Sequence, residues 1–119
     1  MNQDSTTYRV VFQLSSNDTF VQKALLRQLN NLLKAMEDVQ VEVVTHSYGI
    51  DMLLKESPFR ESIEDLKKRG VRFLVCENTL KADEVDVSEL MGMTSVVPAG
   101  VAHIIRRQTE GWAYIKAGY

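Results

Sequence analysis

Residues 57–76, SPFRESIEDLKKRGVRFLVC, contain one complete helix–strand unit. Ser57 can cap a helix, Pro58 suits its first position, and Gly70 suits its end. Acidic residues come first in the helical part and basic residues last, in agreement with the helix dipole. The residues after Gly70 are mostly apolar, as in a buried strand. The stretch therefore predicts a helix followed by a strand that ends at Cys76.

The same alternation continues on both sides of this unit. Segments rich in β-branched and apolar residues predict strands at 8–14, 39–45, 71–76 and 94–97, and 112–116 predicts a fifth strand or an extended tail. Helical periodicity covers residues 19–36, and again residue 101 up to Gly111, while 77–93 predicts a short helix and a loop. Alternating strands and helices predict an α/β fold: a three-layer α/β/α sandwich around a mainly parallel five-stranded sheet.

Composition indicates one globular domain. The chain has 119 residues, of which 45% are hydrophobic and 25% charged, enough to build a core without metal or disulfide. We divide it into a polar leader at 1–7 and a single domain at 8–119. With a net charge of −2 and no apolar stretch of membrane-spanning length, we expect no nucleic-acid and no membrane partner. The polar start and the single cysteine predict a cytoplasmic location.

Function is expected at the carboxyl ends of the strands, because parallel sheets gather their ligands at that edge. Residues 15–18, 46–49, 76–79 and 98–100 should lie there together. Cys76 ends a predicted strand, and Asn78 and Thr79 are plausible caps of the next helix. A helix start favours the reactive thiolate, although the adjacent Glu77 would oppose ionisation. The alternative is a packed cysteine that acts as a small hydrophobe, and both interpretations stay open.

The two histidines also have two interpretations each. His46 could act as a general base or orient a ligand near Cys76, or it could be a loop histidine with an ordinary hydrogen bond. His103 lies beside Arg106 and Arg107, which predicts a basic helix face that is solvated or contacts another subunit. With two histidines, one cysteine and no cofactor-binding motif, we predict no metal and no cofactor.

Three separated motifs resemble the DsrE/DsrF-like family of small intracellular sulfur-metabolism proteins: VRFLVCENTL (71–80), VVPAGV (96–101) and RRQTEGWAYI (106–115). The likeness runs from Tyr8 to about Lys116 and includes residues 11–14 and 46–50. It implies a flavodoxin-like α/β/α domain that assembles into homotrimers or homohexamers. In characterised sulfur-relay members, a cysteine at the end of the third strand carries a persulfide between partner proteins. Cys76 matches that position.

The chain looks closest to the uncharacterised single-protein branch of the family. Relay subunits have a turn rich in glycine and small residues after the first strand, where this chain has Ser15-Ser16-Asn17-Asp18. The first functional hypothesis is a sulfur carrier or sulfurtransferase with Cys76 as the persulfide site, supported by Asn78, Thr79, His46 and Gly49, and with sulfur donor and acceptor proteins as partners. The alternative is a non-catalytic oligomeric binding or scaffold module with a structural Cys76. A weaker third possibility is a phosphate-containing ligand at residues 15–19.

Overall fold

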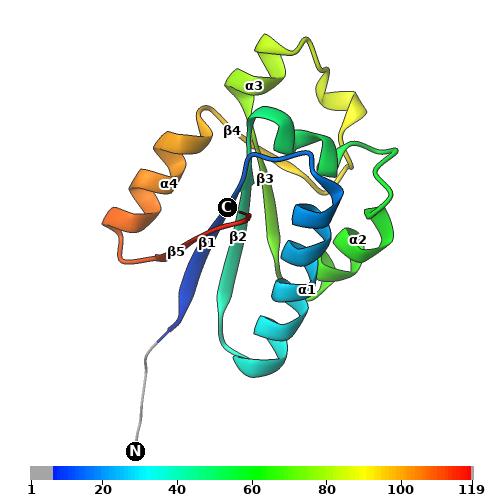
Figure 1. Ribbon diagram of the computed structural model, residues 1–119. Helices are drawn as coiled ribbons and strands as arrows, with labels where there is room; N and C mark the ends of the chain where they lie inside the picture. Colours follow the sequence, from blue (N-terminus) through cyan, green and yellow to red (C-terminus); the bar gives the residue numbers. More distant parts are fainter. Residues whose placement is uncertain (1–6, 119) are drawn as a thin grey trace, which may run out of the picture.

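The computed structural model describes residues 7–118, and the strands in this part form one five-stranded sheet (Figure 1). The strands are β1 (Arg9–Leu14), β2 (Gln40–Thr45), β3 (Arg72–Cys76), β4 (Ser95–Val97) and β5 (Ala113–Lys116). The helices are α1 (Thr19–Ala35), α2 (Arg60–Lys68), α3 (Glu77–Ala82) and α4 (Gly100–Thr109), with 3₁₀ helices η1 (Ser47–Leu53) and η2 (Val87–Glu89). The strand order is β4-β3-β2-β1-β5, and all neighbours are parallel.

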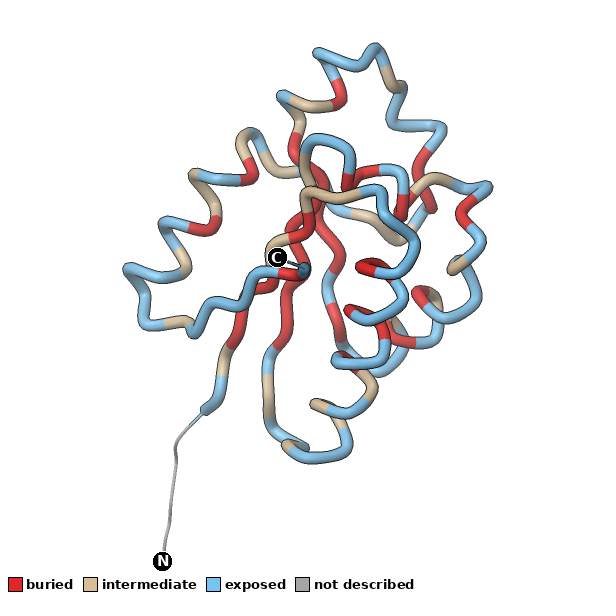
Figure 2. The backbone as a smooth tube through the Cα atoms, viewed as in Figure 1, coloured by how far each residue is buried: buried red, intermediate tan, exposed pale blue. Residues whose placement is uncertain are grey.

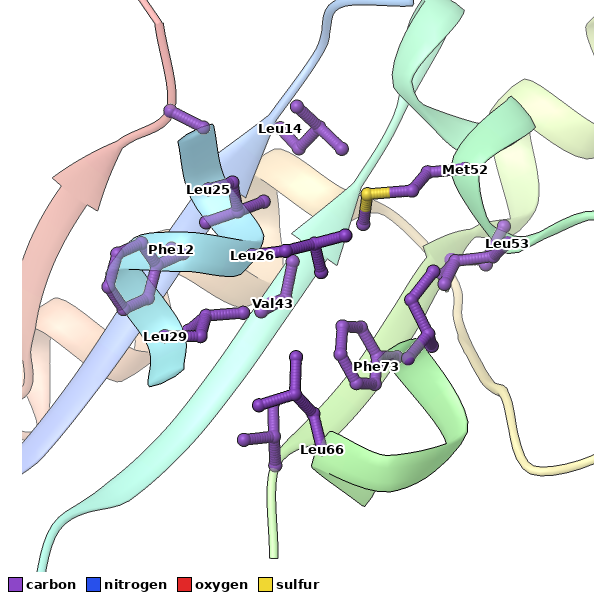
Figure 3. Close-up of a cluster of buried hydrophobic side chains, with 14 of the residues drawn as sticks. Phe12, Leu14, Leu25, Leu26, Leu29, Val43, Met52, Leu53, Leu66 and Phe73 are labelled. Atoms are coloured by element: carbon purple, nitrogen blue, oxygen red, sulfur yellow. The ribbon is translucent and has the colours of Figure 1, made fainter. Parts of the chain in front are cut away.

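Helices cover both faces of the sheet, which confirms the predicted three-layer α/β/α sandwich (Figure 1). α1 and α2 enclose the larger core, where Phe12, Leu29 and Phe73 are among the buried side chains (Figure 3). α4 encloses a smaller core on the opposite face, which includes Val11 and Ile104. Successive residues of a strand point to opposite faces, so one apolar strand supplies both cores. This explains why the strands are continuous apolar runs.

Two boundaries differ from the predictions. The helix predicted from Ser57 begins at Arg60, because residues 57–59 form a turn in which the Ser57 hydroxyl accepts a hydrogen bond from the Phe59 backbone N–H at 3.2 Å. The predicted loop at 46–49 is the beginning of the 3₁₀ helix η1. That helix continues to Leu53 because its apolar residues, such as Met52, are buried in the larger core.

The C-terminal segment predicted as a strand or a tail is a strand. β5 pairs in parallel with β1, with Val10 opposite Ala113 and Gln13 opposite Lys116. It forms one edge of the sheet, and its four residues are exposed (Figure 2). The pairing brings the last part of the chain beside the first strand, which a sequence pattern cannot specify.

Candidate functional site

The segments that follow β1, β2, β3 and β4 meet at one edge of the sheet, as the parallel arrangement predicts (Figure 1). Cys76 is the last residue of β3, and the segments that follow β3 and β4 lead to opposite faces of the sheet. α3 follows Cys76, and its Leu80 packs in the larger core, whereas α4 follows β4 and covers the opposite face. Such a divergence between neighbouring strands is where α/β sheets place their ligands. The fold therefore puts Cys76 at the favoured position for chemistry.

Cys76 is a free cysteine that is only 7% exposed. Burial raises the pKa of its thiol, but hydrogen bonds from the backbone N–H groups of Gly100, Thr79 and Asn78 and from the Thr79 hydroxyl outweigh this effect. The pKa therefore lies below the ordinary value of a cysteine. These donors all stabilise the thiolate, which is the nucleophilic form.

Asn78 and Thr79 contribute differently from the prediction. They were expected to cap α3, but Cys76 is itself the N-cap residue and α3 begins at Glu77. Asn78 and Thr79 therefore lie in the first turn, where backbone N–H groups have no partner within the helix. From that position they lower the pKa of the Cys76 thiol instead of capping the helix with their side chains.

Gly100 is a site residue that the sequence analysis placed at this edge without assigning it a role. A Cβ atom at this position would lie 3.3 Å from Cys76 Cβ and 3.1 Å from Val44 Cγ1. Glycine thus lets the start of α4 approach the sulfur closely enough to donate its backbone N–H. The available sequence signal is a glycine that follows Pro98-Ala99 at the end of a strand.

His46 is linked to Cys76 through a chain of hydrogen bonds and not by direct contact. The Tyr114 hydroxyl donates to Gln13 Oε1, so the Gln13 amide N–H donates to His46 Nε2 at 2.8 Å. His46 Nδ1 then carries the ring proton and donates to Ser47 Oγ at 2.9 Å. The Ser47 backbone N–H donates to Thr79 Oγ1 at 3.0 Å, which leaves the Thr79 hydroxyl proton for the sulfur.

This series of hydrogen bonds requires the neutral form of the His46 ring. Burial lowers the pKa of His46, in agreement with a ring that accepts at Nε2 and donates at Nδ1. Gln13 and Tyr114 carry no signal in the sequence, because they meet only through the pairing of β1 with β5. His46 thus orients Ser47, and through it Thr79, with both ring nitrogens already engaged.

Gly49, the remaining predicted supporting residue, packs against β1. A Cβ atom there would lie 2.3 Å from the Leu14 carbonyl oxygen, so only glycine fits. Ser47, which precedes it in η1, has a left-handed φ of 53°. Gly49 therefore places η1, and with it Ser47, against the sheet.

A surface cavity of about 400 Å³ adjoins the site. It is lined by residues from η1, from α3 and from the end of α3: Ser47, Tyr48, Asn78, Thr79, Ala82 and the C-cap residue Asp83. Thr79 both lines this cavity and lowers the pKa of Cys76. The cavity is therefore one side chain away from the sulfur.

The hydroxyl-rich turn at residues 15–18 caps α1, as its composition predicts. Asp18 is the N-cap residue, and its Oδ1 accepts a hydrogen bond from the Phe20 backbone N–H at 2.8 Å. A phosphate bound at this helix start would meet the Asp18 carboxylate, so the geometry disfavours the phosphate hypothesis.

The expectation of a solvated basic face on the last helix is wrong for His103 and Arg107. His103 Nε2 lies 2.7 Å from Glu42 Oε1, and Arg107 donates to both oxygens of Glu42 at 2.9 and 2.8 Å. Glu42 is on β2 and is 1% exposed, so these side chains turn under α4 toward the sheet. Arg106 is exposed as predicted. Glu42 lies within the predicted strand at 39–45, whose other residues are mostly apolar, and the sequence analysis assigned it no role. Its carboxylate contacts the side chains of His103 and Arg107.

Two further properties of residues 7–118 bear on the class of site. In this part of the chain, no group of three or more His, Cys, Asp or Glu side chains is arranged to hold a metal ion. None of the helices there is both long and apolar enough to cross a membrane.

Comparisons with known proteins agree with the fold. A structure of a protein of unknown function, MTH1491 from Methanobacterium thermoautotrophicum, is 42% identical, with a TM-score of 0.90 over 92% of this chain and 98% of that one. YchN from E. coli (9% identity, TM-score 0.78, 93% and 99% covered) and BT1422 from Bacteroides thetaiotaomicron (10%, 0.74, 91% and 93%) share the fold. No curated protein matched the chain. The model of the DsrE/DsrF-like family matches residues 9–117, and the chain therefore belongs to the DsrE/DsrF-like family.

Proposed function

We propose that this protein is a sulfur carrier that holds a persulfide on Cys76. The family is associated with sulfur relay, and the observation that carries the proposal is the place of Cys76 at the end of β3, where it is the N-cap residue of α3 and the start of α4 approaches it at Gly100. Three backbone N–H groups and one hydroxyl stabilise a thiolate in a position that is nearly buried. A purely structural cysteine has no need of four donors, because a neutral thiol is a weak acceptor.

The proposed reaction is an exchange without net oxidation. The Cys76 thiolate attacks the outer sulfur of a donor protein's persulfide, a new S–S bond forms, and the old S–S bond breaks to release the donor thiolate. The proton of the outer sulfur stays with it. In the second half, an acceptor thiolate attacks the outer sulfur and Cys76 leaves as a thiolate. The lowered pKa of Cys76 raises its thiolate fraction in the first half and makes it a better leaving group in the second.

The adjoining cavity is the proposed place for partner contact. Cys76 is 7% exposed, so a donor must approach closely through the side on which the protein surface is hollow. The exposed Tyr48 lines this cavity together with Asn78 and Thr79. We propose that donor and acceptor thiols enter from this cavity and that the protein works in the cytoplasm, where a single cysteine remains reduced.

Intact mass spectrometry tests the proposal. Wild-type protein and Cys76→Ser are incubated with a small-molecule persulfide and then with a thiol reductant. We expect one or more sulfur atoms to add to wild type alone, and the reductant to remove them. If neither protein gains sulfur although both are folded, the proposal is wrong.

The second candidate is a binding or scaffold module in which Cys76 only packs. It is favoured by the low exposure of Cys76 and by the close packing of its Cβ atom against Gly100. Under this function, Cys76→Ser leaves all binding properties unchanged and Cys76 reacts slowly with alkylating reagents.

Either function is compatible with a homo-oligomer. We propose a trimer or hexamer from the family and from exposed apolar residues on α4 and β5.

A further inference from the structure

A second cavity lies at the opposite edge of the sheet from Cys76. It has a volume of about 380 Å³ and is lined by the first residues of β1, β2 and β3 and by the end of α4. Three arginines, Arg9, Arg72 and Arg107, contribute to its wall, together with Trp112. Small-molecule sites in proteins begin at about this size.

The arginines are organised by one buried carboxylate. Glu42 accepts hydrogen bonds from Arg107 at both oxygens and from Arg72 Nη1 at 2.6 Å, and His103 lies 2.7 Å away. Glu42 is only 1% exposed, so it borders the cavity with its carboxylate largely covered by these side chains. Burying a carboxylate is unfavourable compared with an apolar residue of the same size, so stability alone does not account for it. Its effect is to hold the guanidinium groups in position.

The three arginines differ in how many of their guanidinium nitrogens already make hydrogen bonds. Each guanidinium nitrogen of Arg107 makes a hydrogen bond, since Nε and Nη2 donate to Glu42 and Nη1 donates to Glu110 Oε1 at 2.9 Å. Arg72 uses only Nη1, and Arg9 uses only Nη2, at 3.3 Å from the Glu110 carbonyl oxygen. Among residues 7–118, the remaining guanidinium nitrogens of Arg9 and Arg72 have no protein acceptor, and the Arg72 side chain is 51% exposed.

The sheet register brings these two arginines to the same small region. Arg9 pairs with Gln40 and Arg72 with Glu42, so they lie on the strands that flank β2, two residues apart in register. Each is an even number of residues from a side chain of the smaller core, Val11 or Leu74, and therefore points to the α4 face. Two strand spacings of about 4.8 Å and two residues of about 3.3 Å separate their backbones by about 12 Å, a gap that two arginine side chains can span to hold one small anion between them.

We propose that this cavity binds a small molecule that bears a phosphate or sulfate group, held between Arg9 and Arg72. Three guanidinium groups and two carboxylates, Glu42 and Glu110, line the cavity, so one positive charge remains for a ligand. Guanidinium groups bind tetrahedral oxyanions through paired N–H donors. Trp112 already has Arg107 at 4.6 Å and Arg9 at 5.8 Å from its ring centroid. The ring therefore orients the arginines, and the ligand is recognised by charge.

Trp112 provides a direct readout, because it is the only tryptophan of the chain and lines the cavity. Intrinsic fluorescence is titrated with inorganic phosphate, sulfate and glycerol 1-phosphate at constant ionic strength, with sodium acetate as the reference anion. We expect a saturable change with at least one of the three. Saturation by the inorganic ions indicates a free oxyanion as ligand, and saturation by glycerol 1-phosphate alone indicates a phosphomonoester. A linear response to all three overturns the proposal.

Matched charge variants locate the binding. Arg9→Gln and Arg72→Gln should each weaken the saturable response about tenfold or more, because each removes hydrogen bonds to a charged ligand. Arg106→Gln makes the same change of net charge outside the cavity and should bind like wild type. Arg9→Gln leaves the hydrogen bonds to Glu42 intact, so it tests the proposal even if Arg72→Gln does not fold. Equal binding by Arg9→Gln and Arg106→Gln overturns the proposal.

Discussion

Thr79 is the residue through which the reactivity of Cys76 can be tested without removing the sulfur. Thr79→Val deletes the hydroxyl donor but keeps the size and the backbone N–H. We expect the thiol pKa to rise and alkylation by iodoacetamide at pH 7 to slow roughly tenfold, because a hydrogen bond to a charged group is lost. The rate is measured against pH by intact mass, which is unambiguous with one cysteine.

Thr79→Ser is the control for that experiment, because it retains the hydroxyl group. It should alkylate at nearly the wild-type rate over the whole pH range. For the wild type, the lowered pKa of Cys76 means that the rate reaches its plateau at a lower pH than for free cysteine. Equal rates for Thr79→Val and wild type would show that the hydroxyl does not stabilise the thiolate.

The charge of Glu42 contributes to the stability of the fold, because this carboxylate is buried among cationic side chains. Glu42→Gln should lower the free energy of unfolding by about 3 kcal/mol, because Arg72, Arg107 and His103 lose their buried anionic partner. Denaturant unfolding measures this loss. Glu64→Gln is the matched control, since Glu64 pairs with Arg60 at an exposed position, and it should change stability by less than about 0.5 kcal/mol.

The contribution of Glu42 also has a predictable pH dependence. Burial raises the pKa of this carboxyl, but hydrogen bonds from Arg107 and His103 outweigh that effect and the pKa lies below 4.5. At pH values between the lowered pKa of the folded state and the ordinary pKa of 4.5, the folded state therefore binds fewer protons than the unfolded state. Stability from Glu42 is fully present above about pH 4.5 and is lost as the pH falls toward the lowered pKa. Wild type should approach Glu42→Gln in stability on acidification, and a constant difference down to low pH would contradict this account.

At the scale of elements, the 3₁₀ helix η1 is placed by one backbone contact. Gly49→Ala would put a Cβ atom 2.3 Å from the Leu14 carbonyl oxygen and should cost about 2–3 kcal/mol, as the clash is with backbone. Gly92→Ala has no atom within 4 Å of the added Cβ and should be neutral or slightly stabilising. Thermal and denaturant unfolding of both variants measure the difference. Similar stability of the two would show that η1 can shift without cost.

The same element connects stability with the site. η1 carries Ser47, whose backbone N–H holds the Thr79 hydroxyl, so displacing η1 should also slow the alkylation of Cys76. Gly49 is thus a structural residue with an indirect effect on the sulfur. The sequence places it in the correct segment but cannot show that its contact is with β1, because Leu14 and Gly49 are brought together by the pairing of β1 with β2.

At the scale of the whole molecule, exposed apolar side chains on α4 bear on assembly. Val101 and Ile105 are 54% and 58% exposed on successive turns of α4. We expect sedimentation of wild type at micromolar concentration to show a trimer or hexamer, and Ile105→Glu to shift the distribution toward monomer with unchanged circular dichroism. Arg106→Gln, at a neighbouring exposed position, changes the net charge by the same amount and is the control. A monomeric wild type would remove the assembly proposal.

The prediction of fold from sequence was accurate where the pattern is local. The order of helices and strands follows from apolar periodicity, and the capping of α1 by Asp18 follows from residue type. Two local predictions were wrong in detail, because residues 57–59 form a turn instead of helix and Cys76, not Asn78 or Thr79, is the N-cap residue of α3. A long-range contact decided the third. His103 and Arg107 left the predicted solvated face because Glu42 lies beneath them.

By itself, the sequence determined the α/β class, the parallel sheet and the position of Cys76 at a strand end, because these depend on periodicity and residue type within short segments. Only the tertiary structure decided that β5 lies beside β1, that Gly100 approaches Cys76, and that Glu42 collects its cationic partners. Each of these contacts joins residues that are far apart in the chain. They depend on strand order and register, which are set by the simultaneous packing of both cores and leave no local pattern.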